Sequence, residues 1–299
     1  MTTLSAVGSL AYRPGMKLFL VALVIAVTAI AGAALIMPAR PSAGRVAFAV
    51  WRIMSREAHG GGYADINTVR IYYETYGSGP PVLILHGGTG KLEDMFNQIR
   101  ALAATHFVVA ADSRGHGRST DAEAPLSYAL MADDMLKLLD HLSIRQTDIV
   151  GWSDGGIVAL DMAMTHPDRV RRLVVIGANY DVDGLIGPPA AATAIPAVPR
   201  SYARTAPDPE HWPILYRKVV TMWATQPHYT AQDLEHIQAP TLVMAGEFDI
   251  IKRQHTDHLA QAIPGSEEAI IPGGTHAMVR EKPELVNASV LRFLAKPSP

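Results

Sequence analysis

The most constraining feature of the sequence is a serine set between glycines, where a strand-like segment gives way to a helix-like one. Residues 148–150, DIV, have the apolar character of a buried strand end, and residues 156–164, GIVALDMAM, have apolar side chains at helical spacing. Between them, residues 151–155, GWSDG, fit the pattern G-x-S-x-G, whose small flanking residues hold the serine in a strained conformation at a sharp turn. An ordinary serine in a Gly-rich turn is the alternative that this motif alone leaves open.

Strand-like and helix-like runs alternate along the chain from Gly62 onward. A hairpin with its turn near Asn67 and Thr68 comes first, and short apolar runs such as PVLIL and TLVMAG follow, separated by amphipathic segments of which residues 127–142 are an example. Continuous apolar strands with helices between them predict an α/β fold, with a parallel sheet covered on both faces. Active sites in such sheets lie at the carboxyl ends of the strands.

The expected strand ends carry a set of residues with complementary chemistry. A His-Gly-Gly sequence at residues 86–88 follows PVLIL, and Ser153 follows DIVGW. Further along the chain, Asp249 follows LVMAGEF and His276 follows AIIPGGT. A serine hydroxyl is a poor nucleophile until an imidazole takes its proton, and a carboxylate can orient that imidazole. The four segments are therefore predicted to meet in one catalytic site.

These motifs, together with their order Ser, Asp, His, resemble the α/β-hydrolase fold superfamily. The motifs are HGG, DSRGHGRS, GWSDGG, GEFD and GGTH, and the resemblance covers about residues 62–296. It implies a serine hydrolase with a mostly parallel eight-stranded sheet, helices on both faces and an inserted cap. Within the loop DSRGHGRS, Arg114 and His116 are expected to be structural and to hold the loop near the site.

The resemblance implies a role for each site residue. Ser153 would be the nucleophile, His276 the base and Asp249 the acid that fixes the imidazole tautomer. The oxyanion hole would consist of the backbone N–H groups of Asp154 and Gly88. Thr89 is the alternate second donor.

Other residues of the same types compete for two of these roles. Two histidines lie three residues apart on a helix-like stretch, where a solvated face is the simpler interpretation, and two aspartates follow the strand-like run RLVVIGAN, where some α/β hydrolases place the acid. These competitors are His255, His258, Asp181 and Asp183. His86 is expected to be a structural part of the HG turn.

The expected reaction is hydrolysis of small carboxylic esters through an acyl-enzyme intermediate. A serine nucleophile disfavours the dehalogenases and epoxide hydrolases of this superfamily, which use aspartate. Hydrolysis of lactones, amides or C–C bonds by the same triad remains open, as does a non-catalytic relative that only binds ligands. A lipase acting at a membrane surface is a further alternative. No metal and no organic cofactor are expected.

Asp154 raises a separate question, because a carboxylate beside an oxyanion should oppose catalysis. The favoured interpretation is an acid in the first turn of a helix that points away from the oxyanion and is stabilised by the helix dipole. The alternative places Asp154 in the pocket, facing a cationic substrate group. GWSDGGIVAL and VVIGANY resemble the biphenyl-hydrolase-like, or valacyclovirase, branch, which implies that Asp154 binds the α-amino group of amino-acid esters. Trp152 is the other candidate substrate-binding residue.

The N-terminal region departs from the globular pattern. Residues 18–37, LFLVALVIAVTAIAGAALIM, carry no charge and as a helix would span roughly 30 Å, the thickness of the hydrocarbon core of a bilayer. They are expected to form a single-pass membrane anchor after a tail of residues 1–17. A cleaved signal, which would leave a secreted or periplasmic protein, is the alternative. Residues 38–61 would connect this segment to the hydrolase domain, residues 62–299.

The Pro- and Ala-rich residues 180–238 are expected to form a cap inserted over the sheet edge, and a disordered linker is the alternative.

Composition restricts the possible ligands and chemistry. A net charge of −2 gives no sign of a nucleic-acid-binding surface. The absence of cysteine excludes disulfides and thiolate catalysis but does not identify the compartment. The expected partner is a small-molecule ester, and the sequence does not indicate an oligomeric state.

Overall fold

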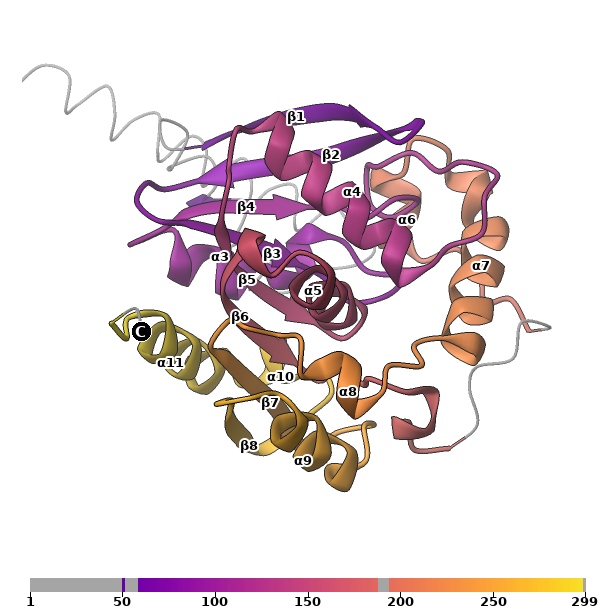
Figure 1. Ribbon diagram of the computed structural model, residues 1–299. Coiled ribbons are helices and arrows are strands. Elements are labelled where there is room, and N and C mark those ends of the chain that lie inside the picture. The colour runs from indigo at the N-terminus through magenta and orange to yellow at the C-terminus, as the bar shows by residue number, and fades with distance from the viewer. Residues whose placement is uncertain (1–49, 52–58, 188–193, 298–299) are drawn as a thin grey trace, which may run out of the picture. The chain divides into compact units, whose positions relative to one another are not determined.

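One eight-stranded sheet organises the computed structural model, which describes residues 50–51, 59–187 and 194–297 (Figure 1). Its strand order is β1-β2-β4-β3-β5-β6-β7-β8. The hairpin β1–β2 and the pair β2–β4 are antiparallel, and all other pairs are parallel, which confirms the predicted sheet. The strands are β1 (His59–Ile66), β2 (Val69–Tyr76), β3 (Pro81–Leu85), β4 (Phe107–Ala111), β5 (Thr147–Trp152), β6 (Val170–Ile176), β7 (Thr241–Phe248) and β8 (Glu267–Thr275).

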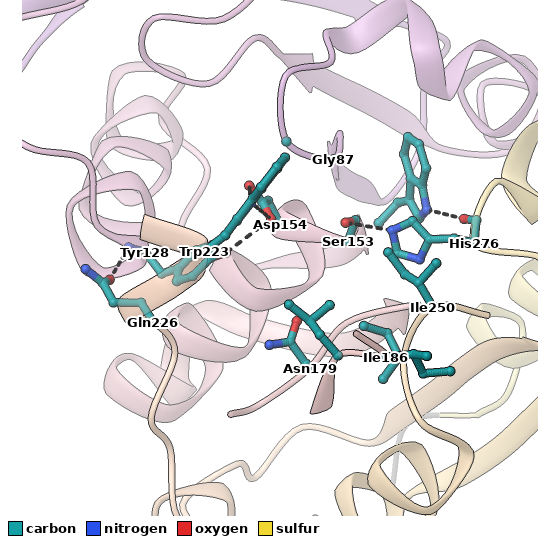
Figure 2. Close-up of a pocket in the computed structure, with 14 residues that line it drawn as sticks. Gly87, Tyr128, Ser153, Asp154, Asn179, Ile186, Trp223, Gln226, Ile250 and His276 are labelled. Carbon is teal, nitrogen blue, oxygen red and sulfur yellow. Dashed lines mark hydrogen bonds between the residues drawn. The ribbon is translucent and has the colours of Figure 1, made fainter. Parts of the chain in front are cut away.

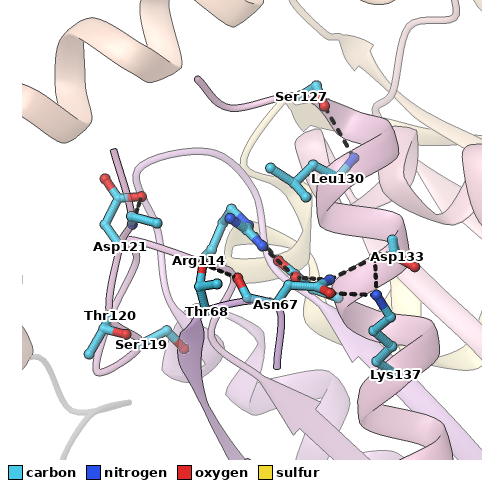
Figure 3. Close-up of polar contacts among 12 residues, drawn as sticks. Asn67, Thr68, Arg114, Ser119, Thr120, Asp121, Ser127, Leu130, Asp133 and Lys137 are labelled. Carbon is cyan, nitrogen blue, oxygen red and sulfur yellow. Dashed lines mark hydrogen bonds and ion pairs between the residues drawn. The ribbon is translucent and has the colours of Figure 1, made fainter. Parts of the chain in front are cut away.

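The hairpin turn lies where the sequence predicts it. Asn67 and Thr68 have φ values of 47° and 68°, as two-residue turns between twisted strands require. The Asn67 amide donates to Asp133 at 2.7 Å and to Asp134 at 2.9 Å, which fastens the turn to a helix (Figure 3). Strand β1 begins at His59, so the sheet starts inside the expected connector of residues 38–61.

Helices cover both faces of the sheet, as expected. Helices α4 and α5 pack against each other in front of the sheet in Figure 1, while α3 contacts α11 on the other face. Strand β5 is buried along its whole length, as an inner parallel strand should be. The helices are α3 (Phe96–Leu102), α4 (Tyr128–His141), α5 (Asp154–Thr165), α9 (Arg253–Ala262), α10 (Met278–Glu281) and α11 (Pro283–Leu294).

A helical cap occupies the chain between β6 and β7. Its helices are α6 (Arg200–Thr205), α7 (Trp212–Thr225) and α8 (Ala231–Leu234), and Figure 1 shows α6 and α7 beyond the carboxyl ends of the parallel strands. Lys218 of α7 and His211 donate to Asp121 of the core at 2.8 and 2.7 Å. Burial raises the pKa of Asp121, but these two partners together hold it below its usual value. A charged carboxylate therefore ties the cap to the core.

The expected membrane segment, residues 18–37, lies outside the described residues, as does most of the connector. Within the residues that the structure does describe, no helix has both the length and the apolar character needed to cross a bilayer.

Candidate active site

The serine lies at a strained corner between β5 and α5. Ser153 has φ 56° and ψ −124°, a backbone conformation that residues other than glycine rarely adopt. The turn needs glycine on both sides, because a Cβ at Gly151 would collide with the backbone of Gly155, and a Cβ at Gly155 would lie 2.5 Å from the Leu85 carbonyl oxygen. The G-x-S-x-G pattern therefore forms the predicted elbow, with the serine at its tip.

Ser153, His276 and Asp249 form a continuous hydrogen-bonded chain. The Ser153 Oγ is 2.9 Å from His276 Nε2, and His276 Nδ1 is 2.7 Å from Asp249 Oδ1. The three residues follow β5, β8 and β7, whose carboxyl ends meet at one edge of the sheet. The structure thus brings together the three side chains that the sequence singled out. A base beside the hydroxyl and an acid beside the base is the arrangement that activates a serine.

Asp249 is held as a charged acceptor. Its Oδ2 accepts the N–H of Gly246 and its Oδ1 accepts the N–H of Ile251, both at 3.2 Å. Burial raises the pKa of Asp249, but hydrogen bonding and attraction to His276, with help from the two backbone donors, keep it below the usual value. At neutral pH the carboxylate is ionised and can hold a proton on His276 Nδ1, which leaves Nε2 free to accept one from Ser153.

Trp152 and Gly177 help to position the side chains of the triad. The Trp152 indole N–H donates to the His276 carbonyl oxygen at 2.8 Å. Gly177 has φ 57°, and a Cβ there would lie 3.1 Å from Asp249 Oδ2 and 3.2 Å from His276 Nδ1. The absence of a side chain at Gly177 therefore leaves room for the acid–imidazole pair.

The loop DSRGHGRS is bound to its surroundings by buried polar groups. Arg114 binds Asp134 of α4 through Nε at 2.5 Å and Nη2 at 2.6 Å (Figure 3). His86 Nε2 accepts the Ser113 N–H at 3.0 Å, and His116 Nδ1 contacts the Arg114 carbonyl at 2.8 Å. Burial lowers the pKa of His116 to about 4, so this imidazole is neutral. These contacts agree with the structural roles expected for Arg114, His116 and His86.

The hydrogen bonds of the triad do not include any of the competing residues. Asp181 pairs with His228 at 2.8 Å on the exposed side of the cap. His258 is exposed, as predicted, but the solvated face expected for His255 is wrong. The His255 ring is buried, stacks on Tyr180 at a centroid distance of 3.9 Å and accepts the Tyr180 N–H at 3.0 Å. From α9 it packs against Tyr180, which follows β6, and helical spacing does not reveal this tertiary contact.

The triad opens into a cavity of about 320 Å³. Figure 2 shows Asp154 and Trp223 on one side of Ser153, and His276 and Ile250 on the other. The walls on the first side are largely polar, and those on the second are apolar and partly exposed. The first group is Tyr128, Asp154, Asn179, Trp223 and Gln226, and the second includes Ile186 and Ile250. Leu185 and Ile251 also line the cavity.

The two residues expected to supply the oxyanion donors, Asp154 and Gly88, line this cavity. Asp154 is the first residue of α5, so its backbone N–H has no acceptor within the helix. Gly88 also lines the cavity, and a Cβ there would collide with Asp154 Oδ2 and lie 2.6 Å from Trp223 Cζ2. The loop after β3 therefore passes directly beside the start of α5. The alternate donor, Thr89, has φ 55° and does not belong to the cavity wall.

The Asp154 side chain turns into the cavity wall and not away from the site. It is only 4 % exposed and accepts the Trp223 indole N–H at 2.9 Å and the Tyr128 hydroxyl at 3.1 Å. Burial raises the pKa of Asp154 to about 6, against the lowering effect of these two donors. Asp154 does lie in the first turn of α5, as the favoured interpretation expects, but its side chain lines the cavity and does not turn away from the site. The reason is that α7 and α4 supply hydrogen-bond donors on the inner side.

Sequence reasoning missed several residues that shape the cavity. Trp223 and Gln226 come from the cap, and Tyr128 comes from the first turn of α4. Their only sequence signal is aromatic and amide character at a helix end, which is also typical of ordinary packing. Their approach to Ser153 depends on how the cap folds over the sheet, and no local pattern encodes that.

The fold and the site geometry together define a family, and the chain belongs to the α/β-hydrolase fold family. The family model described as alpha/beta hydrolase fold matches residues 80–209. The "Putative carbamate hydrolase RutD" of Azorhizobium caulinodans is 30 % identical over 257 residues, which cover 77 % of this chain and 97 % of RutD. This chain is a hydrolase of that superfamily.

The chain is also similar to a serine hydrolase and to a solved structure of a lactone-degrading enzyme. The mouse (Mus musculus) serine hydrolase BPHL is 30 % identical over 251 residues, which cover 77 % of this chain and 84 % of BPHL. Among solved structures, Est816, described as an N-acyl homoserine lactone degrading enzyme, superposes with a TM-score of 0.64 at 28 % identity. That superposition covers 78 % of this chain and all of Est816.

Proposed function

We propose that the chain hydrolyses small carboxylic esters through an acyl-enzyme intermediate, with Ser153, His276 and Asp249 as the catalytic triad. The observation that carries the proposal is the pair of hydrogen bonds from Ser153 Oγ to His276 Nε2 and from His276 Nδ1 to Asp249. Ser153 lies in a strained turn, and it lines a cavity that is large enough for a small ester.

In the first half of the reaction, Ser153 Oγ attacks the ester carbonyl carbon while His276 Nε2 takes the hydroxyl proton. Asp249 stabilises the imidazolium that results. The tetrahedral oxyanion accepts hydrogen bonds from the backbone N–H groups of Asp154 and Gly88, and losing one such donor typically costs about 3–4 kcal/mol of transition-state stabilisation. His276 then protonates the departing alcohol, and water repeats the sequence to release the acid.

The polar side of the cavity supports a preference for acyl groups that carry a cation. The buried Asp154 carboxyl lies beside Ser153, and the hydrogen-bond donors that reach it within the described part of the chain, Trp223 and Tyr128, are neutral. An α-ammonium group on the substrate would supply the missing positive charge. Trp152 lines the cavity next to His276 and is the second side chain proposed to contact the substrate. The relative BPHL is named a serine hydrolase, which agrees with a serine nucleophile in this chain.

A burst experiment tests the proposed mechanism. The full-length chain is mixed rapidly with p-nitrophenyl acetate, and the expected result is a burst of one nitrophenolate per active site before the steady state. Ser153→Ala is expected to abolish the burst, whereas Asp183→Asn, an exposed aspartate away from the triad, leaves it unchanged. Steady hydrolysis by Ser153→Ala at the parent rate would contradict the serine mechanism.

Lactones are the second substrate class, and the observation that favours them is the similarity to Est816, described as a lactone-degrading enzyme. A lactone is a cyclic ester, so the same triad would open it by the same steps. Comparing kcat/KM for a γ-lactone and for the corresponding open-chain ester separates the two preferences.

The N-terminal segment completes the proposal. Residues 18–37 carry no charged side chain, and we propose that they anchor the hydrolase domain to a membrane as a single span. Fractionation of cells producing the chain tests this: extraction from membranes by detergent but not by carbonate supports an anchor. A shortened chain free in the periplasm or medium would support signal cleavage instead.

A further inference from the structure

One aromatic side chain closes the polar side of the cavity. The Trp223 indole N–H is 2.9 Å from each carboxylate oxygen of Asp154, and a Cβ at Gly88 would lie 2.6 Å from Trp223 Cζ2. The ring edge that carries these two atoms is therefore fixed by a hydrogen bond and by packing against the loop after β3. A side chain held in this way does not rotate freely, so Trp223 forms a rigid wall.

Trp223 also borders a second cavity of about 200 Å³. The other walls of this outer cavity include Val182, Ala224 and Lys252, none of which lines the cavity around Ser153. Leu185 and Trp223 are the residues that line both cavities. These two side chains are therefore the partition between the active-site cavity and the outer cavity.

The orientation of the catalytic groups decides which half of an ester meets this partition. His276 must reach the oxygen of the leaving alcohol, so the alcohol lies on the side of His276 and Ile250. The carbonyl oxygen points to the N–H groups of Asp154 and Gly88. The side of Ser153 opposite His276 is left for the acyl chain, and Figure 2 shows Asp154 and Trp223 on that side.

We propose that Trp223 determines specificity by limiting the length of the acyl group. An acyl chain fits only if it ends before the indole ring, and shortening the side chain at this position joins the two cavities into one longer channel. This inference rests on the proposed function, because it assumes that Ser153 attacks an ester whose acyl group enters the polar side.

Esters of one alcohol with acetyl, butanoyl, hexanoyl and octanoyl groups test the wall. In the parent, kcat/KM is expected to fall by about tenfold or more from butanoyl to octanoyl, since a methylene that does not fit a pocket costs about this much. Trp223→Leu is expected to raise the octanoyl-to-acetyl ratio of kcat/KM by about tenfold. Trp223→Phe keeps an aromatic ring without the N–H, so its ratio should stay close to that of the parent.

A control variant fills the outer cavity and leaves the partition intact. Ala224 borders only the outer cavity, so Ala224→Phe alone should leave the chain-length profile unchanged. In the double variant Trp223→Leu/Ala224→Phe, the added ring blocks the new space and should reverse the gain for octanoyl esters. A general loosening of the site would not be reversed at this position.

Two results would overturn the inference. One is a parent that hydrolyses octanoyl and butanoyl esters equally well, which needs no variant and so does not depend on folding. The other is an unchanged ratio in Trp223→Leu. Failure of the proposed function differs from both, because then neither the parent nor Trp223→Leu would show a nitrophenolate burst with p-nitrophenyl acetate.

Discussion

The two sides of the cavity each carry a buried aspartate, and their environments differ. Asp249, on the His276 side, contacts an imidazole that can become charged and accepts two backbone N–H groups, and its pKa is below the usual value. Asp154, on the Trp223 side, accepts hydrogen bonds from an indole and a phenol, and burial raises its pKa to about 6. Depth of burial is similar, at 8 % and 4 % exposed. Burial raises the pKa of both carboxyl groups, and the hydrogen-bond partners of Asp249 outweigh this effect whereas those of Asp154 do not.

The two aspartates therefore suit different roles in the site. A carboxylate that keeps its charge can orient and stabilise an imidazolium throughout the reaction. A buried carboxyl without a cation is costly to ionise, so it gains most from a positively charged ligand.

Replacing Asp249 should disable the side that stays charged. Asp249→Asn keeps the shape but removes the charge and favours the wrong imidazole tautomer, so we expect kcat/KM for p-nitrophenyl acetate to fall about 10⁴-fold. Steady-state kinetics measures the loss. Asp181→Asn is the matched control, since Asp181 pairs with His228 away from the triad. A loss of less than tenfold in Asp249→Asn would mean that another group orients His276.

The Asp154 side should reveal itself in the pH dependence of stability. Because the folded pKa lies above the ordinary carboxyl value of about 3.9, burial of the protonated group stabilises the fold below about pH 4, and this contribution is lost as the pH rises to about 6. The loss amounts to roughly 3 kcal/mol. Asp154→Asn does not titrate and should escape it.

Thermal unfolding of the parent and Asp154→Asn from pH 4 to 7.5 measures this effect. We expect the Tm of the variant to rise relative to that of the parent from about pH 4 to 6. Above about pH 6 the difference in Tm should stay constant. A difference in Tm that does not change with pH would show that Asp154 has an ordinary pKa in the folded chain.

Substrate charge provides a sharper test of the same side. Asp154→Asn should lower kcat/KM for an amino-acid ester by about tenfold or more, since a hydrogen bond to a charged group contributes about 1.5–3 kcal/mol. The matching ester without the amino group should lose little. Equal losses on both esters would contradict amine binding by Asp154.

The smallest effect is expected at Trp152, which lines the cavity and donates a hydrogen bond to the His276 carbonyl oxygen. Trp152→Phe removes the hydrogen bond to the His276 carbonyl, worth about 1 kcal/mol, and kcat should fall by a few-fold with little change in KM. Steady-state kinetics with p-nitrophenyl acetate provides the measurement. A change in KM alone would indicate that Trp152 contacts substrate and does not position the imidazole.

Local patterns in the sequence predict much of this molecule. The strand ends at Ser153, Asp249 and His276 could be located because short apolar runs and Gly-rich turns mark them, and parallel strands bring their carboxyl ends together. The hairpin turn at Asn67 and Thr68 followed from the same kind of reasoning.

The remaining features depend on tertiary packing. The inward orientation of Asp154 requires Trp223 from α7 and Tyr128 from α4, which are far from it along the chain. Burial of His255 requires Tyr180 from the segment after β6. A helical periodicity places these residues on a face but does not indicate which element packs on that face, so neither contact could be predicted.

The most direct test of the account is whether Ser153 is an activated nucleophile. The full-length chain is treated with a fluorophosphonate, and intact mass followed by peptide mapping locates the adduct. We predict a single adduct on Ser153, absent from Ser153→Ala and strongly slowed in His276→Ala. A folded parent that stays unlabelled, or one labelled at another residue, would contradict the assignment of the triad.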